Sequence, residues 1–270
     1  MTPERGAAAG AASERWLEGR HAIVTGGSRG LGAAIADALA ARGARVSVLG
    51  RDEAALERVA AGLGRHGVDA MALACDVTDA AGVAAAFARA RDAHGDPYVL
   101  VNNAGQADGA PFLETTRDLW DRMLAVNLTA AYLCAQQVLG AMLERSAGRI
   151  VNVASMSGLR GYRNVSAYTA AKHGLVGLTR ALAAETVRHG ITVNALCPAY
   201  ADTDMARAAT RTVMRDMGKT ESEAAAMIAR TVQRGTLIEP REVASAAAWL
   251  CSPDATGITG QAIAIAGGEV

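Results

Sequence analysis

The sequence predicts an α/β fold: one doubly wound, seven-stranded parallel sheet with helices on both faces. Three observations lead to this prediction. Short apolar or β-branched runs alternate with longer helical stretches. A glycine-rich turn follows the first run, and polar residues stand at the ends of later ones. The 270 residues, 51% of them hydrophobic, provide material for one large core.

The individual elements follow from this alternation. Strands are expected over residues 21–26, 45–50, 69–77, 98–105, 148–155, 191–198 and 261–268. Helices are expected over 31–42, 52–64, 79–94, 115–145, 166–189 and 240–251. Strict β/α alternation is typical of a parallel sheet. No repeat or Pro/Gly/Ser-rich linker divides the chain, so a flexible tail (residues 1–18) and a single domain (residues 19–270) are predicted.

One segment interrupts the alternation. Residues 199–239 have helical composition and no strand pattern. The segment follows a strand end, where open α/β sheets bind their ligands. It is interpreted as a helical substrate lid, with a hairpin that merely thickens the domain as the alternative.

Composition excludes several classes of partner. The 27 basic and 27 acidic residues give no net charge that would attract nucleic acid or an anionic membrane. No apolar run of membrane-spanning length and no signal peptide are expected. The four cysteines are too dispersed for a metal site and are read as reduced, buried thiols. A cytoplasmic protein with a small-molecule partner and no metal is predicted.

The first predicted strand runs into TGGSRGLG, Thr25 to Gly32, which opens a helix. The glycines at 26, 30 and 32 permit a sharp turn and close ligand approach, and the helix N-terminus presents free N–H groups to a pyrophosphate. A Gly-rich turn at this place predicts a Rossmann-type dinucleotide site. The spacing is G-x-x-x-G-x-G, which differs from the common G-x-G-x-x-G.

The second predicted strand ends in Gly50 and Arg51, where sites that select NAD usually carry an acid. An arginine can instead bind a 2′-phosphate with charge-assisted hydrogen bonds. Arg29 in the glycine loop offers a second positive charge, and Asp52 and Glu53 are assigned to the start of the next helix. NADP(H) is therefore favoured over NAD(H).

The stretch SAYTAAKHG places Tyr168 and Lys172 four residues apart, on one face of a predicted helix. An ordinary surface helix would explain this spacing. The alternative is an acid whose pKa the neighbouring ammonium lowers. Ser155, at the end of the fifth predicted strand, and Asn102 to Gly105, at the end of the fourth, should open on the same crevice as the glycine loop.

Over residues 20–270 the chain resembles the short-chain dehydrogenase/reductase family. The resemblance rests on TGGSRGLG, CDV (75–77), NNAG (102–105), Asn127, Ser155, YTAAK (168–172) and CPAYADTDM (197–205). It implies that Tyr168 exchanges a proton with the substrate oxygen, that Ser155 hydrogen-bonds this oxygen, that Lys172 holds the nicotinamide ribose and lowers the Tyr168 pKa, and that Asn127 supports a proton relay. The expected cofactor-binding residues are Gly26, Ser28, Arg29, Gly30, Leu31, Gly32, Arg51, Asp76, Val77, Asn103, Ala104, Gly105, Tyr168, Lys172, Pro198, Ala199 and Thr203.

One departure from the family pattern is Ala199, where the family usually has glycine. Within the family the chain looks most like 3-oxoacyl thioester reductases and 3-hydroxyacyl-CoA dehydrogenases. An NADPH-dependent 3-oxoacyl thioester reductase is the leading hypothesis, with a CoA- or carrier-protein-linked substrate. An NAD-dependent secondary-alcohol dehydrogenase and a non-catalytic dinucleotide-binding regulator are the alternatives. Family resemblance also suggests a homotetramer, and the arginines considered for a phosphopantetheine arm are Arg160, Arg163, Arg207 and Arg211.

Overall fold

The computed structural model describes residues 15–269, which form one seven-stranded sheet. Its strand order is β3-β2-β1-β4-β5-β6-β7, and every neighbouring pair is parallel. This confirms the predicted fold class. The strands are β1 (His21–Thr25), β2 (Arg45–Gly50), β3 (Ala70–Ala74), β4 (Pro97–Asn102), β5 (Gly148–Val153), β6 (Ile191–Pro198) and β7 (Ala262–Ile265).

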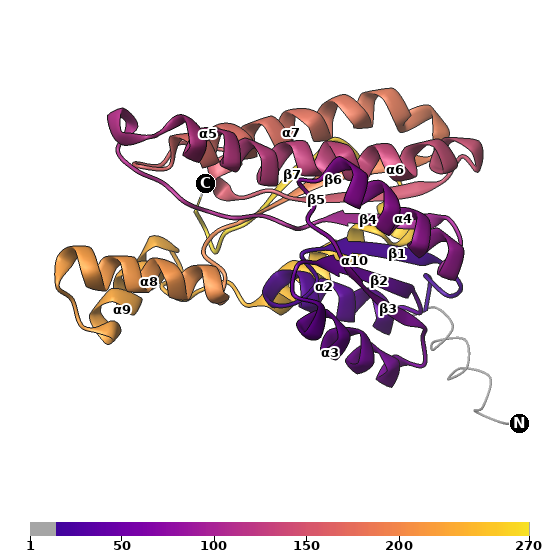
Figure 1. The fold of residues 1–270 in the computed structure, drawn as a ribbon, viewed down its shortest axis with the longest axis horizontal. Coiled ribbons are helices and arrows are strands. Elements are labelled where there is room, and N and C mark those ends of the chain that lie inside the picture. Colours follow the sequence, from indigo (N-terminus) through magenta and orange to yellow (C-terminus); the bar gives the residue numbers. More distant parts are fainter. Residues whose placement is uncertain (1–14, 270) are drawn as a thin grey trace, which may run out of the picture.

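Helices cover both faces of this sheet (Figure 1). Their bounds are α2 (Gly30–Ala41), α3 (Glu53–Leu63), α4 (Ala80–His94), α5 (Arg117–Leu124), α6 (Ala130–Glu144), α7 (Ser166–Thr186), α8 (Asp204–Met217), α9 (Glu221–Thr231) and α10 (Pro240–Leu250). Alternate strand residues point to opposite faces. Ala22 and Val24 of β1 join the core beneath α2, α3 and α10, whereas Ile23 joins the core beneath α4 and α6.

The strand order places the ligand crevice. β1 lies between β2 and β4, so the chain leaves β1 on one side and returns on the other. Ligands of open α/β sheets bind at such a switch point, beyond the carboxyl ends of the strands. The glycine loop after β1 and the segment after β4 meet there.

The helix predicted over 115–145 is interrupted by a π-helical turn, Ala125–Thr129, between α5 and α6. Asn127 is buried in this turn, and π-turns within helices often occur at functional sites. The run Arg117–Glu144 is long and apolar enough to cross a membrane by length and composition alone, contrary to the expectation that no such run exists. In the fold, its α6 part packs on β4 and β5.

Two segments refine the predicted domain limits. Most of the predicted tail lies outside the described residues, but Leu17 is fully buried and its N–H donates to the Arg42 carbonyl at 2.9 Å. The folded part thus begins before residue 19, because the Leu17 side chain packs in the hydrophobic core. The 199–239 segment forms α8 and α9, and a parallel bridge between Ala201 and Ile238 joins its two ends.

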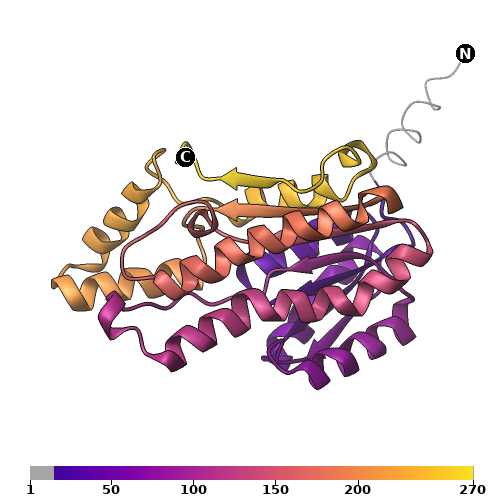
Figure 2. The ribbon, with the colours of Figure 1, turned by 90° about the horizontal axis from the view of Figure 1, so that it is seen from above.

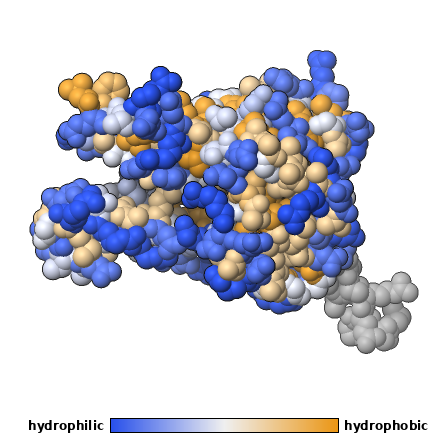
Figure 3. Space-filling model, viewed as in Figure 1, coloured by the Kyte–Doolittle hydropathy of each residue, from blue (hydrophilic) through white to orange (hydrophobic). Residues whose placement is uncertain are grey.

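The α8–α9 pair extends away from the sheet (Figure 2). A cleft separates it from the arm that carries α5 and the start of α7 (Figure 3). This cleft leads towards the carboxyl ends of the strands.

Candidate active site

The glycine loop has no room for side chains at its turns. Gly26 has φ +65°, and a Cβ there would lie 2.8 Å from the Asn103 amide nitrogen. A Cβ at Gly32 would meet the Gly26 carbonyl oxygen. The start of α2 therefore lies directly against the turn, which leaves its first backbone N–H groups beside the crevice. This cradle fits the pyrophosphate of a dinucleotide.

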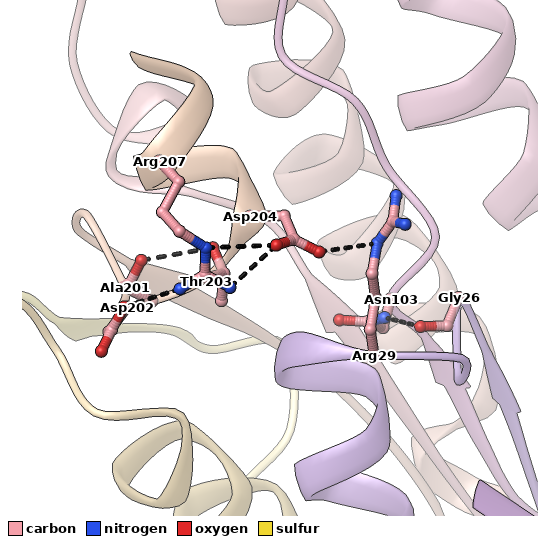
Figure 4. Close-up of polar contacts among 8 residues, drawn as sticks. All are labelled: Gly26, Arg29, Asn103, Ala201, Asp202, Thr203, Asp204 and Arg207. Atoms are coloured by element: carbon pink, nitrogen blue, oxygen red, sulfur yellow. Dashed lines mark hydrogen bonds and ion pairs between the residues drawn. The ribbon is translucent and has the colours of Figure 1, made fainter. Parts of the chain in front are cut away.

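Thr25 and Asn103 lock the glycine loop to the end of β4. The Thr25 hydroxyl accepts hydrogen bonds from the backbone N–H groups of Asn103 and Ala104, at 3.0 and 3.1 Å. The Asn103 amide donates to the Thr25 carbonyl at 2.9 Å and to the Gly26 carbonyl at 3.1 Å, the latter drawn in Figure 4. Asn103 was predicted to bind the adenosine side, whereas its amide group is committed here to holding the loop.

The end of β2 carries the residues expected to select the cofactor. Arg51 is exposed and forms no ion pair with any described residue. Asp52 accepts a hydrogen bond from the Ala55 N–H at 3.0 Å and so caps α3, as predicted. The backbone N–H and the hydroxyl of Thr78 bind the Asp76 carboxylate, and they lower its pKa. Arg51 also contributes to the lowered pKa of Asp76, but it forms no ion pair with that carboxylate.

Arg29 has a partner that the sequence did not indicate. Its guanidinium lies 3.2 Å from the Asp204 carboxylate at the start of α8 (Figure 4). Asp204 also pairs with Arg207 at 2.8 Å. A Cβ at Gly30 would lie 3.3 Å from the Thr203 methyl group. The helical insertion thus touches the glycine loop through Thr203 and Asp204.

Tyr168 and Ser155 meet at the carboxyl end of β5. Ser155 caps a short 3₁₀ turn, Met156–Gly158, and its hydroxyl is hydrogen-bonded to the Tyr168 phenol. Burial raises the pKa of Tyr168 to about 12, although the hydrogen bond with Ser155 lowers it. The phenol is therefore a neutral proton donor at neutral pH.

Lys172 lies one helical turn after Tyr168 and is 3% exposed. Its ammonium donates to the Val153 carbonyl at 2.9 Å and lies 5.7 Å from the centroid of the Tyr168 ring. Burial lowers the pKa of Lys172 to about 8. Burial is the largest influence on the Tyr168 pKa and Lys172 is not among the groups that shift it, so the effect of Lys172 on the phenol stays a prediction.

Asn127 holds the segment after β4. Its amide donates to the carbonyls of Gln106 and Met123, at 2.8 and 3.1 Å, and its oxygen accepts from the Gln106 N–H at 3.2 Å. A Cβ at Gly105 would lie 2.9 Å from the Asn127 oxygen and 3.4 Å from the Lys172 nitrogen. Asn127, Gly105 and Lys172 are thus brought together.

The remaining positions predicted to bind the cofactor differ in which of their atoms are accessible to a ligand. Leu31 lies partly buried against the core beneath α2. The Val77 side chain is 6% exposed and belongs to the core on the other face, so only the Val77 backbone can reach a ligand. Pro198 ends β6, and Ala199 follows it without a positive φ, so its methyl group causes no backbone strain. Among residues 15–269, no group of His, Cys, Asp and Glu could hold a metal ion.

A buried polar chain was missed by the sequence reasoning. The Asn102 amide donates to the Asn152 oxygen at 2.9 Å, and the Asn152 amide donates to the Thr179 hydroxyl at 2.8 Å. This chain ties β4 and β5 to α7, the helix that carries Tyr168 and Lys172. Its signal in the sequence is an asparagine within the apolar strand run IVNV.

Two of the four arginines considered for a phosphopantetheine arm already have acidic partners. Arg160 lies 3.6 Å from Glu269, and Arg207 pairs with Asp202 and Asp204. Arg163 and Arg211 form no ion pair with a described residue.

Comparisons with known proteins agree with this geometry. The model of the short chain dehydrogenase family matches residues 20–214. The chain is 40% identical to the protein described as ketoacyl reductase 1 of the granaticin polyketide synthase from Streptomyces violaceoruber, over 92% of both chains. It is 37% identical to 3-oxoacyl-[acyl-carrier-protein] reductase of Vibrio harveyi, over 93% of this chain and 98% of the relative.

A crystal structure of an actinorhodin polyketide ketoreductase variant with NADPH superposes with a TM-score of 0.89 at 39% identity. The alignment covers 92% of this chain and 96% of that one. The family match spans well over half of the chain and includes the glycine loop, Ser155, Tyr168 and Lys172. The chain therefore belongs to the short-chain dehydrogenase/reductase family, whose members use a nicotinamide dinucleotide, and is an oxidoreductase that acts on CH–OH groups.

Proposed function

We propose that the protein reduces a 3-oxoacyl thioester to the 3-hydroxyacyl product with NADPH. The observation that carries this proposal is the neutral, buried Tyr168 phenol hydrogen-bonded to Ser155 beside the glycine cradle. The names of the relatives support the substrate class, because they include a ketoacyl reductase and a 3-oxoacyl-[acyl-carrier-protein] reductase.

The state of Tyr168 favours reduction over oxidation. A ketone that accepts hydride develops negative charge on its oxygen and needs a proton. With a pKa of about 12, Tyr168 carries that proton at neutral pH. Oxidation of an alcohol would need the phenolate, which the same burial disfavours. The NAD-dependent dehydrogenase is therefore the second choice.

The other residues have supporting roles in this proposal. The nicotinamide cofactor supplies the hydride. Ser155 donates a hydrogen bond to the substrate oxygen as negative charge builds on it. Lys172 places a buried positive charge near the Tyr168 phenol and binds the nicotinamide ribose. Asn127 fixes the segment at Gly105, which lies beside both Asn127 and Lys172.

Arg51 supports the choice of NADP(H). It forms no ion pair with a described residue and follows β2, at the end of the strand where the adenosine ribose of such cofactors lies. Ser28 is near the same end, because a Cβ at Gly50 would lie 3.8 Å from its hydroxyl oxygen. The crystal structure with NADPH of a 39% identical relative supports the same choice.

The α8–α9 pair is proposed as the substrate lid. It borders the cleft and touches the glycine loop (Figures 3 and 4). Arg163 and Arg211 are the better candidates for a phosphopantetheine phosphate, since Arg160 and Arg207 are already paired with acids.

A homotetramer is part of the proposal. Only 39% of the most hydrophobic stretch within Arg117–Glu144, which spans α5 and α6, is buried in the fold of one chain. Tyr132 of α6 is 46% exposed. An apolar helical face of this kind suits pairing with a second copy. Sedimentation of the purified protein tests this state. The cytoplasmic location stays a prediction.

Initial rates on acetoacetyl-CoA with NADPH and with NADH test the proposed function. NADPH should be preferred, and a clear preference for NADH would overturn the role of Arg51.

In parallel, Tyr168→Phe should lower kcat about 10³-fold and leave NADPH affinity nearly unchanged, because the acid is lost and the fold is kept. Tyr98→Phe, at the amino end of β4 and away from the crevice, is the matched control. Unchanged turnover in Tyr168→Phe would remove Tyr168 from the acid role.

A further inference from the structure

A carboxylate outside the predicted site is buried shortly after the end of β7. Glu269 is 7% exposed and accepts a hydrogen bond from the Tyr162 phenol. The Arg160 guanidinium lies 3.6 Å from the same Glu269 oxygen and 5.1 Å from the centroid of the Tyr162 ring. Glu269, Tyr162 and Arg160 thus form a closed cluster, in which each side chain contacts the other two.

Tyr162 and Arg160 belong to the loop of residues 159–165, which connects the turn after Ser155 with α7. This loop leads directly to Tyr168. The Tyr162 ring packs on the apolar group that includes Met156 and Cys197, next to Ser155 in the chain and in space. The position of the loop therefore determines the wall of the crevice on the substrate side of Ser155 and Tyr168.

The segment after β7 also contacts the other wall. The Gly267 carbonyl accepts from the Arg234 N–H at 3.0 Å, after the end of α9. A Cβ at Gly267 would lie 2.9 Å from side-chain atoms of Arg234 and Val232. Residues 266–269 thus lie between the 159–165 loop and the base of the helical insertion, in contact with both.

The cluster has the properties of a specific tether. A buried carboxylate is tolerated only when it is paired and hydrogen-bonded, and removal of one partner leaves the others unsatisfied. Burial, and then the hydrogen bond to Glu269, raise the pKa of the Tyr162 phenol, so it remains a donor. Tyr200, which follows Pro198-Ala199, lies close enough to feel both Glu269 and Tyr168 electrostatically. The cluster therefore lies near the reacting groups without contacting Tyr168.

We propose that Glu269 is a positioning residue for the substrate: it holds the 159–165 loop through Tyr162 and Arg160 and thereby sets the substrate wall of the crevice. The expected change in KM rests on the proposed function, whereas the expected loosening of the 159–165 loop does not. Cofactor binding should be independent of Glu269, because the glycine loop and Arg51 lie on the other side of the crevice.

Kinetics of Glu269→Ala provide the first measurement. The KM for acetoacetyl-CoA should rise about tenfold, with kcat changed less than about threefold and the Kd for NADPH unchanged. Glu269→Gln keeps an acceptor for Tyr162 and should recover most of the loss. Tyr162→Phe should reproduce the increase, and the double variant should add little, since both remove one contact. Glu57→Ala, an exposed glutamate on α3, is the control.

Hydrogen exchange of the same variants provides the second measurement, without any substrate. Amides of residues 159–165 should exchange at least about fivefold faster in Glu269→Ala than in the wild type, whereas amides of the glycine loop should not change. If the wild type fails to reduce acetoacetyl-CoA, the proposed function fails and exchange still decides the role of Glu269. Unchanged exchange in the loop, or an equal loss of NADPH affinity, would overturn the proposal.

Discussion

The two sides of the crevice are built in different ways. On the cofactor side, the glycine loop is fixed by backbone contacts and by the hydrogen bonds of Thr25 and Asn103. On the substrate side, α8 meets the glycine loop through the exposed Arg29–Asp204 ion pair, and a short bridge between Ala201 and Ile238 joins the two ends of the helical insertion. Backbone contacts tolerate no extra atoms, whereas exposed ion pairs are weak and can exchange partners. Substitutions that add a single methyl group on the cofactor side should therefore reduce stability and cofactor binding strongly, whereas substitutions of similar size on the lid side should have small effects.

The largest effect is expected from Gly32→Ala. The new methyl group would meet the Gly26 carbonyl oxygen and the Asn103 amide, so the loop must move. We expect a loss of about 2 kcal/mol in the free energy of unfolding and loss of NADPH binding. Urea denaturation and cofactor titration measure both.

Gly64→Ala is the control for this substitution. Gly64 has φ −55°, and nothing lies within 4 Å of its Cβ position, so alanine should be neutral or slightly stabilising there. Equal destabilisation by the two substitutions would show that the close packing of the glycine loop does not cause the loss at Gly32.

A second effect concerns acid stability and a buried histidine at the amino end of β1, the end opposite the crevice. The buried His21 ring is hydrogen-bonded to the Gly95 carbonyl and to Ser47, and burial lowers its pKa from 6.5 to about 4. The unfolded chain thus binds the proton more readily. The stabilisation is complete above pH 6.5 and is lost as the pH falls towards 4, by about 2 kcal/mol at pH 5.

Thermal unfolding between pH 7 and pH 5 tests this dependence. His21→Gln, which cannot titrate, should lose less in Tm than the wild type over this range. Equal losses would show that other groups cause the acid sensitivity.

The smallest effect is expected on the lid side, from Asp204→Asn. It frees Arg29 from its ion pair and should tighten NADPH binding about two- to threefold at low salt, because Arg29 can then turn to the 2′-phosphate. NADH, which lacks that phosphate, should bind as before. Asp216→Asn removes an ion pair with Arg215 near the other end of α8 and is the control. A change of equal size for both cofactors would exclude this explanation.

Much of the fold could be predicted because its signals are local. Each strand is a short apolar run, and the alternation with helices indicates a parallel sheet, which the observed strand order confirms. The predicted tail boundary failed because the burial of Leu17 depends on contacts with residues far along the chain, including Arg42. The π-turn around Asn127 was missed because its hydrogen bonds to Gln106 depend on the end of β4.

The candidate site divides in the same way. Residue types and spacing by themselves determined the glycine loop, the Tyr168–Lys172 face and the polar strand ends, because glycine conformation and helical periodicity are properties of short segments. Tertiary structure alone decided the state of the Tyr168 proton, the pairing of Arg29 with Asp204 and the burial of Glu269 beside Tyr162. Desolvation and ion pairing depend on which distant segments surround a group, and the order of residues along the chain does not contain that information directly.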